Sequence, residues 1–287
     1  MSFDVSSSEP GPDTLDPFFV FDFQAYDDPR DSDQRWSSWL SIEPLCRGPE
    51  PRPDWLVTSQ AAVDTELGVL KTGKEADVFL LERAVPDDPA QSVVMAAKRY
   101  RDEDHRSFHR SSVYTEGRRT RRSRDARALA KKTAHGRAVA AGQWAWAEWE
   151  ALKRCWVAGV PVPYPVQIDG TEILMELVQV DGEAAPRLAQ TRPSRDLLAS
   201  YYDQIRDAMV ELARHGVAHG DLSPYNILAA GERLVIIDLP QAVDIVANPT
   251  GMDFLMRDCR NVCGWFTARG LEVDENDLFA ELLASAF

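Results

Sequence analysis

The strongest constraint on the fold is a polar stretch followed, one short apolar run later, by a single acid. The stretch reads His219-Gly220-Asp221-Leu222-Ser223-Pro224-Tyr225-Asn226, and Val235-Ile236-Ile237-Asp238 follows it. An acid, an amide five residues later and a second acid after a strand can orient a hydroxyl and hold magnesium around a transferring phosphate. A polar turn between a helix and a strand would rarely reproduce all of these spacings, so we infer phosphoryl transfer from ATP.

Each polar group of this stretch has a distinct expected role. Asp221 would orient the attacking hydroxyl or accept its proton, whereas Asn226 and Asp238 would supply hard oxygen ligands to Mg²⁺, with Mn²⁺ as a substitute. His219 is expected to organise the loop by hydrogen bonds rather than to act as the base.

The composition bounds the class of protein. At 287 residues with 44% hydrophobic residues, the chain can form one large domain or two smaller ones. It has no apolar run long enough to cross a membrane and no signal-like start, so we expect a cytoplasmic protein with reduced cysteines and no membrane partner. The net charge of −14 argues against general affinity for nucleic acid.

Residues 1–54 are rich in Asp, Ser and Pro and show little apolar periodicity, so we expect a largely flexible acidic extension. Aromatic residues at Phe18 to Phe21 and at Trp36 and Trp39 interrupt this pattern. They either dock the extension onto the folded protein or form a partner-binding segment.

The folded region is expected to begin near Trp55 with three adjacent antiparallel strands. Leu67 to Leu70, Ala76 to Leu81 and Val93 to Tyr100 have strand patterns. The turn between the first two contains Thr72, Gly73, Lys74 and Glu75, and with Val78 it is predicted to line a nucleotide site. The turn is neither a Walker loop nor a full GxGxxG loop, so alone it would be a weak indication.

Lys98 lies in the third strand, where a lysine can reach the phosphates of a nucleotide. A buried ammonium requires a carboxylate partner. The helix predicted over Ala138 to Ala158 supplies two candidates, of which Glu150 is the first choice and Glu148 the second.

A basic segment precedes that helix, within residues 101–137. A solvated helical face is the simplest interpretation, and a site for phosphate or RNA is the alternative. The acidic extension could also fold back on it. The basic side chains are Arg106, Arg110, Arg118, Arg119, Arg121, Arg122, Arg124, Arg127, Lys131, Lys132 and Arg137.

The remaining patterns complete an α+β fold with two lobes. Ile173 to Val178 predicts a strand, residues 179–193 a connector, and Ser194 the start of a long helix that closes at Gly216. After Asp238 the patterns are mainly helical. We therefore expect an N-lobe of residues 55–178, which includes an antiparallel sheet and a glutamate-bearing helix, and a mainly helical C-lobe of residues 179–287.

These residues together resemble the RIO family of atypical serine/threonine protein kinases. The resemblance runs from about Leu67 to Phe266. Its motifs are Thr72-Gly73-Lys74-Glu75-Ala76, Lys98, the acids in Trp146-Ala147-Glu148-Trp149-Glu150, the His219 to Asn226 stretch, and Phe254-Leu255-x-Arg257-Asp258-Cys259-x-Asn261-Val262.

The resemblance implies a trimmed two-lobe kinase without a full activation loop, of the shorter subgroup that lacks a winged-helix domain. Glu176 and Val178 would present backbone groups to adenine. The acceptor would be a protein hydroxyl, including one on the chain itself, or the carboxylate of Asp238 in an ATPase-like cycle. The basic segment would correspond to a flexible loop of the family, and an ATP-regulated contact with an RNA–protein particle is a further expectation.

Two departures limit the match. Asp238-Leu239-Pro240 lacks the glycine of Asp-Phe-Gly, and Gly220 is frequent in the aminoglycoside phosphotransferases. That family of small-molecule kinases is the alternative assignment. The Thr72 turn and the Phe254 to Val262 stretch favour the RIO family.

Overall fold

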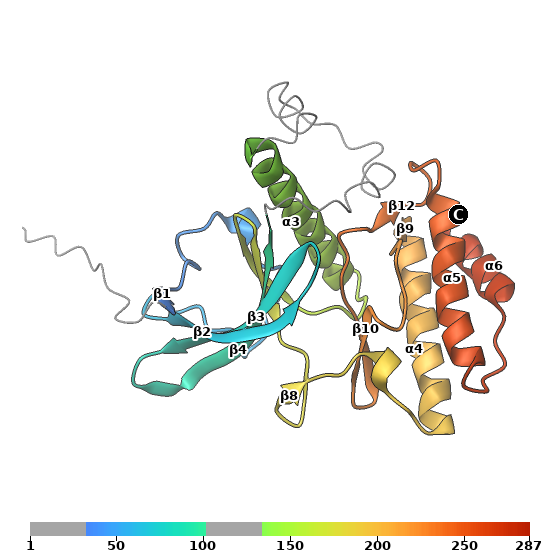
Figure 1. The fold of residues 1–287 in the computed structure, drawn as a ribbon, viewed down its shortest axis with the longest axis horizontal. Coiled ribbons are helices and arrows are strands. Elements are labelled where there is room, and N and C mark those ends of the chain that lie inside the picture. Colours follow the sequence, from blue (N-terminus) through green and yellow to red (C-terminus); the bar gives the residue numbers. More distant parts are fainter. Residues whose placement is uncertain (1–32, 102–133) are drawn as a thin grey trace, which may run out of the picture.

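The structure, a computed structural model, describes residues 33–101 and 134–287. The aromatic residues Phe18 to Phe21 and the basic side chains of residues 106–137 therefore lie outside the described residues and side chains. Two lobes are visible in Figure 1, a sheet-rich lobe and a helical lobe.

A six-stranded antiparallel sheet forms the N-lobe in the order β1-β2-β3-β4-β6-β5. Its strands are β1 (Gln34–Trp36), β2 (Val63–Thr72), β3 (Ala76–Val85), β4 (Asp88–Tyr100), β5 (Pro165–Asp169) and β6 (Glu172–Glu176). The three adjacent antiparallel strands predicted from the sequence are confirmed as β2, β3 and β4. Each is longer than its apolar core indicates, because paired backbone continues beyond the apolar residues.

The sheet begins earlier than the sequence pattern indicates. β1 pairs with β2, and a short 3₁₀ helix, η1 (Pro44–Cys46), follows it. Trp39 is only 2% exposed and belongs to the same apolar cluster as Leu81, Met95 and Tyr164. Residues 34–56 thus form a strap on the N-lobe, because burying one indole outweighs the polar composition around it.

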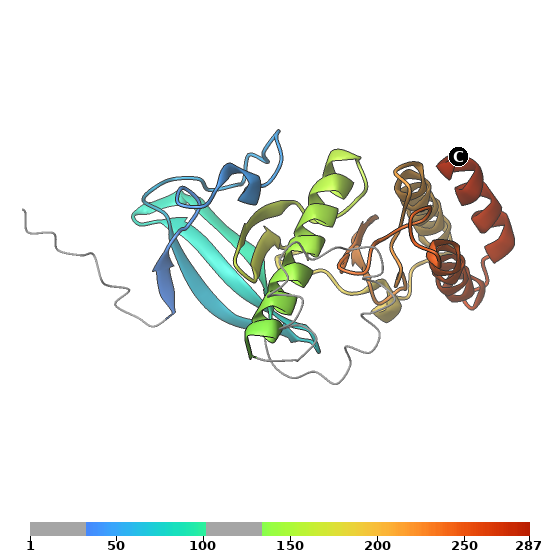
Figure 2. The same ribbon diagram turned by 90° about the horizontal axis from the view of Figure 1, so that it is seen from above.

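Helix α3 (Ala134–Val157) lies between the sheet and the helical lobe, as Figure 2 shows. It corresponds to the helix predicted over Ala138 to Ala158. The chain reverses after it at Gly159, whose φ of 80° suits a residue without a side chain.

The C-lobe contains three helices and three small two-stranded sheets. The helices are α4 (Arg195–Arg214), α5 (Gly251–Thr267) and α6 (Glu275–Ala286), and the 3₁₀ turn η3 (Leu188–Gln190) precedes them. The small strands are β7 (Gln179–Val180), β8 (Glu183–Ala184), β9 (Val217–Ala218), β10 (Ile227–Ala230), β11 (Arg233–Ile236) and β12 (Val243–Asp244). They pair as β7 with β8, β9 with β12, and β10 with β11.

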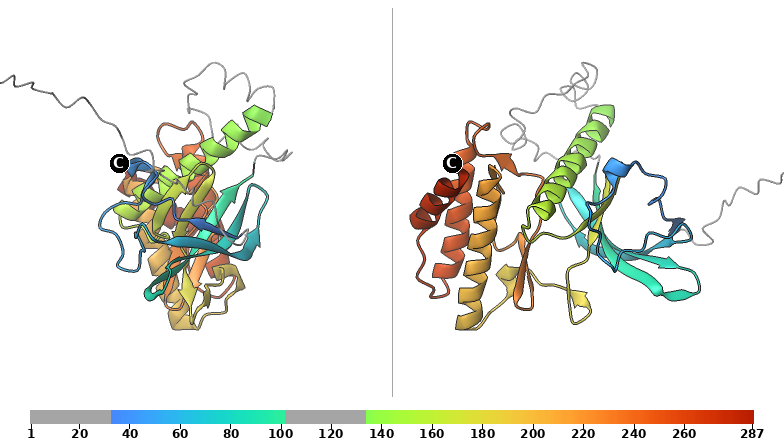
Figure 3. Two further views of the ribbon diagram at one scale, coloured as in Figure 1. Left: turned by 90° about the vertical axis from the view of Figure 1, so that its left-hand side faces the viewer. Right: turned by 180° about the vertical axis from the view of Figure 1, so that it is seen from behind.

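Local capping explains where α4 begins. The Ser194 hydroxyl accepts a hydrogen bond from the Leu197 N–H at 3.3 Å, as the sequence pattern predicts. α6 packs against both α4 and α5, so the three helices form one bundle, which Figure 3 shows from behind. The α+β, two-lobe architecture is confirmed, and within the described ranges no helix is long and apolar enough to cross a membrane.

Candidate active site

Lys98 stands at the junction of the two lobes. Its Nζ lies 2.7 Å from Glu148 Oε1 on α3 and 2.7 Å from Asp238 Oδ1 in the C-lobe. Burial lowers the pKa of Lys98, but the charges of Asp238 and Glu148 outweigh burial and leave that pKa above its ordinary value. Lys98 is therefore a fixed cation that ties the glutamate helix to the metal-ligand candidate.

The glutamate that pairs with Lys98 is Glu148, which corrects the choice of Glu150. Glu148 is 1% exposed, whereas the Glu150 side chain is 40% exposed and pairs with Lys153 at 2.8 Å on the same helix. The two positions are two residues apart and thus face roughly opposite sides of a helix. Only one of them can face the sheet.

Tyr100 completes the carboxylate site. Its hydroxyl donates to Glu148 Oε2, and Lys98 Nζ lies 5.3 Å from the centre of its ring. Burial first, and the charge of Glu148 second, raise the pKa of Tyr100 well above its ordinary value, so it stays a donor. The sequence reading missed Tyr100, although it lies two residues after Lys98 in a strand and therefore on the same face.

Asp238 leaves the β11 strand in a left-handed conformation, with φ of 70°. Such a conformation is uncommon outside glycine and is better tolerated by Asp and Asn. The charge of Lys98 lowers the pKa of Asp238 and outweighs its burial, which acts in the opposite direction. Asp238 is thus held ionised against the lysine.

Asn226 and Asp221 meet at the entry to the β10–β11 hairpin. The Asn226 side-chain amide donates to the Asp221 backbone carbonyl at 2.9 Å. The Ile237 N–H donates to the Asn226 carbonyl at 2.9 Å, which places Asn226 beside the residue that precedes Asp238. The structure therefore brings Asp221, Asn226 and Asp238 into one site with Lys98, as predicted.

His219 organises this loop by two hydrogen bonds. Its Nε2 lies 3.1 Å from the Ile237 carbonyl, and its Nδ1 lies 3.3 Å from the Asp221 N–H. Because Nδ1 must accept from a backbone N–H, Nε2 carries the proton and donates to the carbonyl. The imidazole is occupied on both sides, which suits the organising role rather than that of a base.

Asp258 on α5 fixes the backbone on both sides of Asp221. Its carboxylate accepts from the Gly220 N–H and the Leu222 N–H, each at 2.8 Å. Asn261, one turn later, donates to the Leu222 carbonyl at 3.0 Å. Burial raises the pKa of Asp258 to about 6, although His219 and the two amides lower it. The motif on α5 is thus the support of the loop.

The phosphate-turn candidate forms a tight reversal between β2 and β3. The Gly73 N–H donates to the Ala76 carbonyl at 3.0 Å, and a Cβ at Gly73 would lie 2.6 Å from that oxygen. The turn therefore requires glycine here. Burial raises the pKa of Glu75, and the charge of Asp238 raises it further. Thr72 and Lys74 flank Gly73 in this reversal.

The strand and connector residues predicted to contact adenine lie where the lobes join. Glu176 ends β6, and its N–H donates to the Tyr164 carbonyl at 2.9 Å. Val178 is buried and accepts from the Ala185 N–H at 2.9 Å. Val78 pairs in register with Lys98, so it lies on the same row of the sheet.

The donor set fits a hard divalent cation. The Asn226 amide nitrogen donates to Asp221, which leaves its Oδ1 available to a cation, and Asp238 accepts from Lys98 with one of its two carboxylate oxygens. Mg²⁺ is commonly held by one or two side chains and by phosphate oxygens. The described residues contain no group of three His, Cys, Asp or Glu that could hold a metal ion.

Comparison with known proteins decides between the two kinase families that the catalytic stretch fits. The family profile of the RIO domain matches residues 90–278. A RIO-type serine/threonine-protein kinase Rio1 of Haloferax volcanii is 36% identical over 217 residues, which cover 76% of this chain and 68% of that protein. The serine/threonine-protein kinase RIO3 of Mus musculus is 33% identical over 139 residues, which cover 47% of this chain and 27% of that protein. The chain belongs to the RIO family of serine/threonine protein kinases.

Proposed function

We propose that the chain transfers the γ-phosphate of ATP to a hydroxyl of a protein substrate, with Asp221 as the group that orients this hydroxyl. The observation that carries the proposal is the position of Lys98, held at 2.7 Å by both Glu148 and Asp238, beside Asp221 and Asn226. A lysine fixed in this way supplies a positioned charge to phosphates without reorganisation during the reaction.

The chain's own residues divide the work between the lobes. Thr72, Gly73 and Lys74 would hold phosphate oxygens from the N-lobe, and Lys98 would orient them. Mg²⁺, held by Asn226 and Asp238, would neutralise charge on the phosphates. Asp221 is exposed at the mouth of the site, where an incoming hydroxyl can reach it. Asp258 and His219 fix its backbone, so the carboxylate is presented in one place.

Replacement of Asp221 by Ala tests this assignment. The turnover number should fall by about 10²- to 10⁴-fold, the usual contribution of a positioned acid or base. Nucleotide affinity should change little, because the phosphates are held by other groups. The exposed Asp253 on α5 provides the control, since Asp253→Ala removes the same charge outside the site. Equal turnover in wild type and Asp221→Ala would contradict the proposal.

The acceptor can also be the carboxylate of Asp238. In that cycle the γ-phosphate moves to a carboxylate oxygen of Asp238, ADP leaves, and water then releases inorganic phosphate. The test is mass spectrometry of the protein after incubation with ATP. An acid-labile phosphate that disappears in Asp238→Asn would support this acceptor, whereas phosphoserine or phosphothreonine alone would contradict it.

The basic segment supports a proposal about partners. Arg118, Arg119, Arg121 and Arg122 lie in a chain of strongly negative net charge, so this local excess suits a phosphate-rich partner such as an RNA–protein particle. Neutralising these four residues should abolish association and leave ATP turnover intact. Unchanged association would contradict this role.

We also propose that the protein works in the cytoplasm. All four cysteines, Cys46, Cys155, Cys259 and Cys263, are free thiols, which suits a reducing compartment. Fractionation of the cells that make the protein, with detection of the native chain, tests this location.

A further inference from the structure

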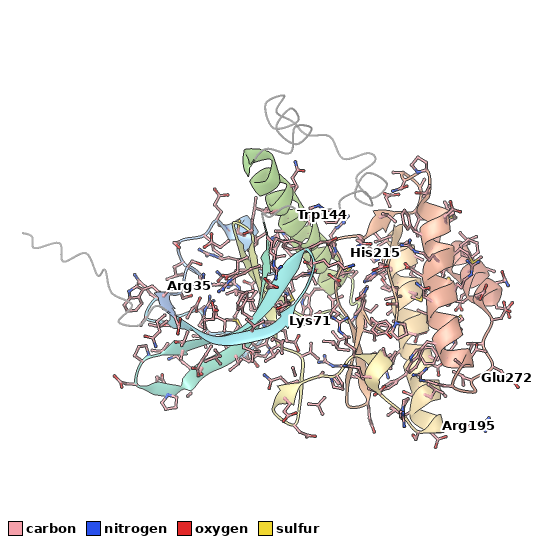
Figure 4. All side chains as sticks on the ribbon, viewed as in Figure 1. Arg35, Lys71, Trp144, Arg195, His215 and Glu272 are labelled. Carbon is pink, nitrogen blue, oxygen red and sulfur yellow. The ribbon has the colours of Figure 1, made fainter. Side chains whose placement is uncertain are left out.

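Two cations that the sequence reading did not select face the site from opposite lobes. Lys71 lies at the end of β2 and is paired in register with Val78, which is itself paired with Lys98. Residues opposite each other on neighbouring strands point to the same face of a sheet. Lys71 therefore projects on the face of Lys98, about 10 Å away across two strands. Figure 4 shows Lys71 at the border between the sheet and the C-lobe.

Arg187 approaches from the C-lobe, beside the catalytic loop. Its backbone bridges to Leu228 on β10, and the Pro186 carbonyl before it accepts from the Ala229 N–H at 2.9 Å. The Ala189 N–H, two residues later, donates to the Pro224 carbonyl at 3.0 Å. The Arg187 segment is thus fixed along the stretch that contains Asn226.

The charges of Lys71 and Arg187 act on each other, and both respond to the charge of Asp238. Burial lowers the pKa of Lys71, and the charge of Arg187 lowers it further. Burial also lowers the pKa of Arg187, whereas Asp238 opposes that change. Within the described part of the chain, neither cation forms an ion pair, while Asp238 is already bound to Lys98.

The negative charge around Lys98 favours additional cations where a polyanion binds. Lys98 pairs with the carboxylates of Glu148 and Asp238, and Asp221 adds a third carboxylate to the site, so the net charge of these four side chains is negative and repels a triphosphate. We propose that Lys71 and Arg187 form a cationic pair, one side chain from each lobe, that binds the terminal phosphate of the nucleoside triphosphate. This inference rests on the proposed nucleotide site and assigns two further binding residues to it.

The pair has a consequence for specificity. A triphosphate reaches both cations and relieves their mutual repulsion, whereas a diphosphate leaves them facing each other. The chain should therefore prefer triphosphate over diphosphate, and that preference should depend on Lys71 and Arg187. Binding of the terminal phosphate would also hold the lobes together, because it connects β2 to the segment before η3.

The experiment measures the dissociation constants of ADP and of a non-hydrolysable ATP analogue, with Mg²⁺, by calorimetry. Lys71→Gln and Arg187→Gln should each weaken analogue binding by about tenfold, the size expected for a charge-assisted phosphate contact, and ADP binding by less than about threefold. The double variant should bind both nucleotides with nearly equal affinity. Arg195→Gln, which removes a charge at the far end of α4, is the control and should change neither constant by more than about twofold.

The possible results distinguish a failure of the cationic pair from a failure of the proposed nucleotide site. A wild-type protein that binds neither nucleotide contradicts the proposed nucleotide site. A wild type that binds the analogue, with a double variant that keeps the wild-type preference, overturns the cationic pair alone. Equal losses for the analogue and ADP overturn the assignment to the terminal phosphate. An effect confined to binding of a phosphorylated peptide also overturns it, because the phosphate would then belong to a substrate.

Discussion

Replacement of Glu148 by Gln removes one charge from the centre of the site and keeps the side-chain shape. Glu148 is 1% exposed. One of its carboxylate oxygens accepts a hydrogen bond from Lys98 Nζ, and the other accepts one from the Tyr100 hydroxyl. Loss of one partner of a buried ion pair usually costs about 3–5 kcal/mol. Because Lys98 keeps Asp238 at 2.7 Å, we expect a smaller loss, about 2–3 kcal/mol in the free energy of unfolding.

The matched control is Glu150→Gln, two residues away on the same helix. Glu150 pairs with Lys153 at 2.8 Å, but its side chain is 40% exposed, so its ion pair is worth about 0.5 kcal/mol or less. The same chemical change is therefore made at a buried and at a surface position of α3. The difference between the variants isolates the site from the general effect of removing a negative charge.

Urea unfolding, thermal unfolding and ATP turnover provide the measurements. Glu148→Gln should lower Tm by roughly 5–8 °C and reduce kcat/KM by about tenfold, since the lysine is no longer held toward the sheet. Glu150→Gln should leave both close to wild type. Equal effects of the two substitutions, or a larger effect at Glu150, would refute the pairing of Lys98 with Glu148.

Two further substitutions test the strap and the loop support. Trp39→Ala should destabilise the protein by about 3–5 kcal/mol because this indole is buried in the N-lobe. Leu40→Ala, at the half-exposed neighbouring position, should cost less than about 0.5 kcal/mol. Urea unfolding compares the two variants, and similar losses of stability would contradict the packing of the strap. For Asp258, the folded pKa of about 6 exceeds the ordinary 3.8, so its stabilising contribution is fully present below pH 4 and is lost as pH rises through 6. The unfolding free energy of wild type minus that of Asp258→Asn should therefore fall by about 2.4 kcal/mol between pH 4 and pH 7, and a constant difference would contradict the burial of this carboxyl.

Most of the candidate site residues could be predicted from the sequence, because phosphoryl transfer needs particular chemical groups at particular spacings. Asp221, Asn226 and Asp238 belong to one hairpin and its entry, so their proximity follows from local geometry. Lys98 was located from its strand, since a charged residue in an apolar strand needs a reason to be there. Local sequence patterns were sufficient to predict a site residue where its role depends on a single strand, hairpin or loop.

The choice between Glu148 and Glu150 shows where local patterns failed. The buried residues of α3 include Ala141, Ala145, Leu152 and Cys155, and Glu148 belongs to this stripe by helical spacing. The tryptophans at 144, 146, 149 and 156 do not follow one stripe, and the exposed Trp146 obscures the pattern. The helical spacing of the buried residues, and not the tryptophans as a group, marks the buried face of α3.

Lys71 and Arg187 were missed for a different reason. Neither has a distinctive local pattern, because Lys71 ends an exposed strand and Arg187 lies in a polar connector. Their significance depends on sheet register and on the way the lobes face each other, which are long-range properties. A register shift between Val69 and Lys71 adds to the difficulty, since simple alternation along β2 misplaces the side chains after the shift.

The two lobes contribute to the site in different ways, through contacts within the C-lobe and through contacts between the lobes. The C-lobe fixes its acids internally, through His219 and the carboxylate of Asp258, so Asp221 keeps its position whichever way the N-lobe stands. The N-lobe reaches the site through Lys71, Lys98 and the phosphate turn, and Lys98 is the side chain that ion-pairs with both lobes among the described residues. Relative movement of the lobes would thus alter nucleotide binding before it disturbed the acids. Substitutions at Lys71 or Lys98 should change nucleotide affinity, whereas substitutions at Asp221 should change turnover, because the fold assigns these tasks to separately stabilised parts.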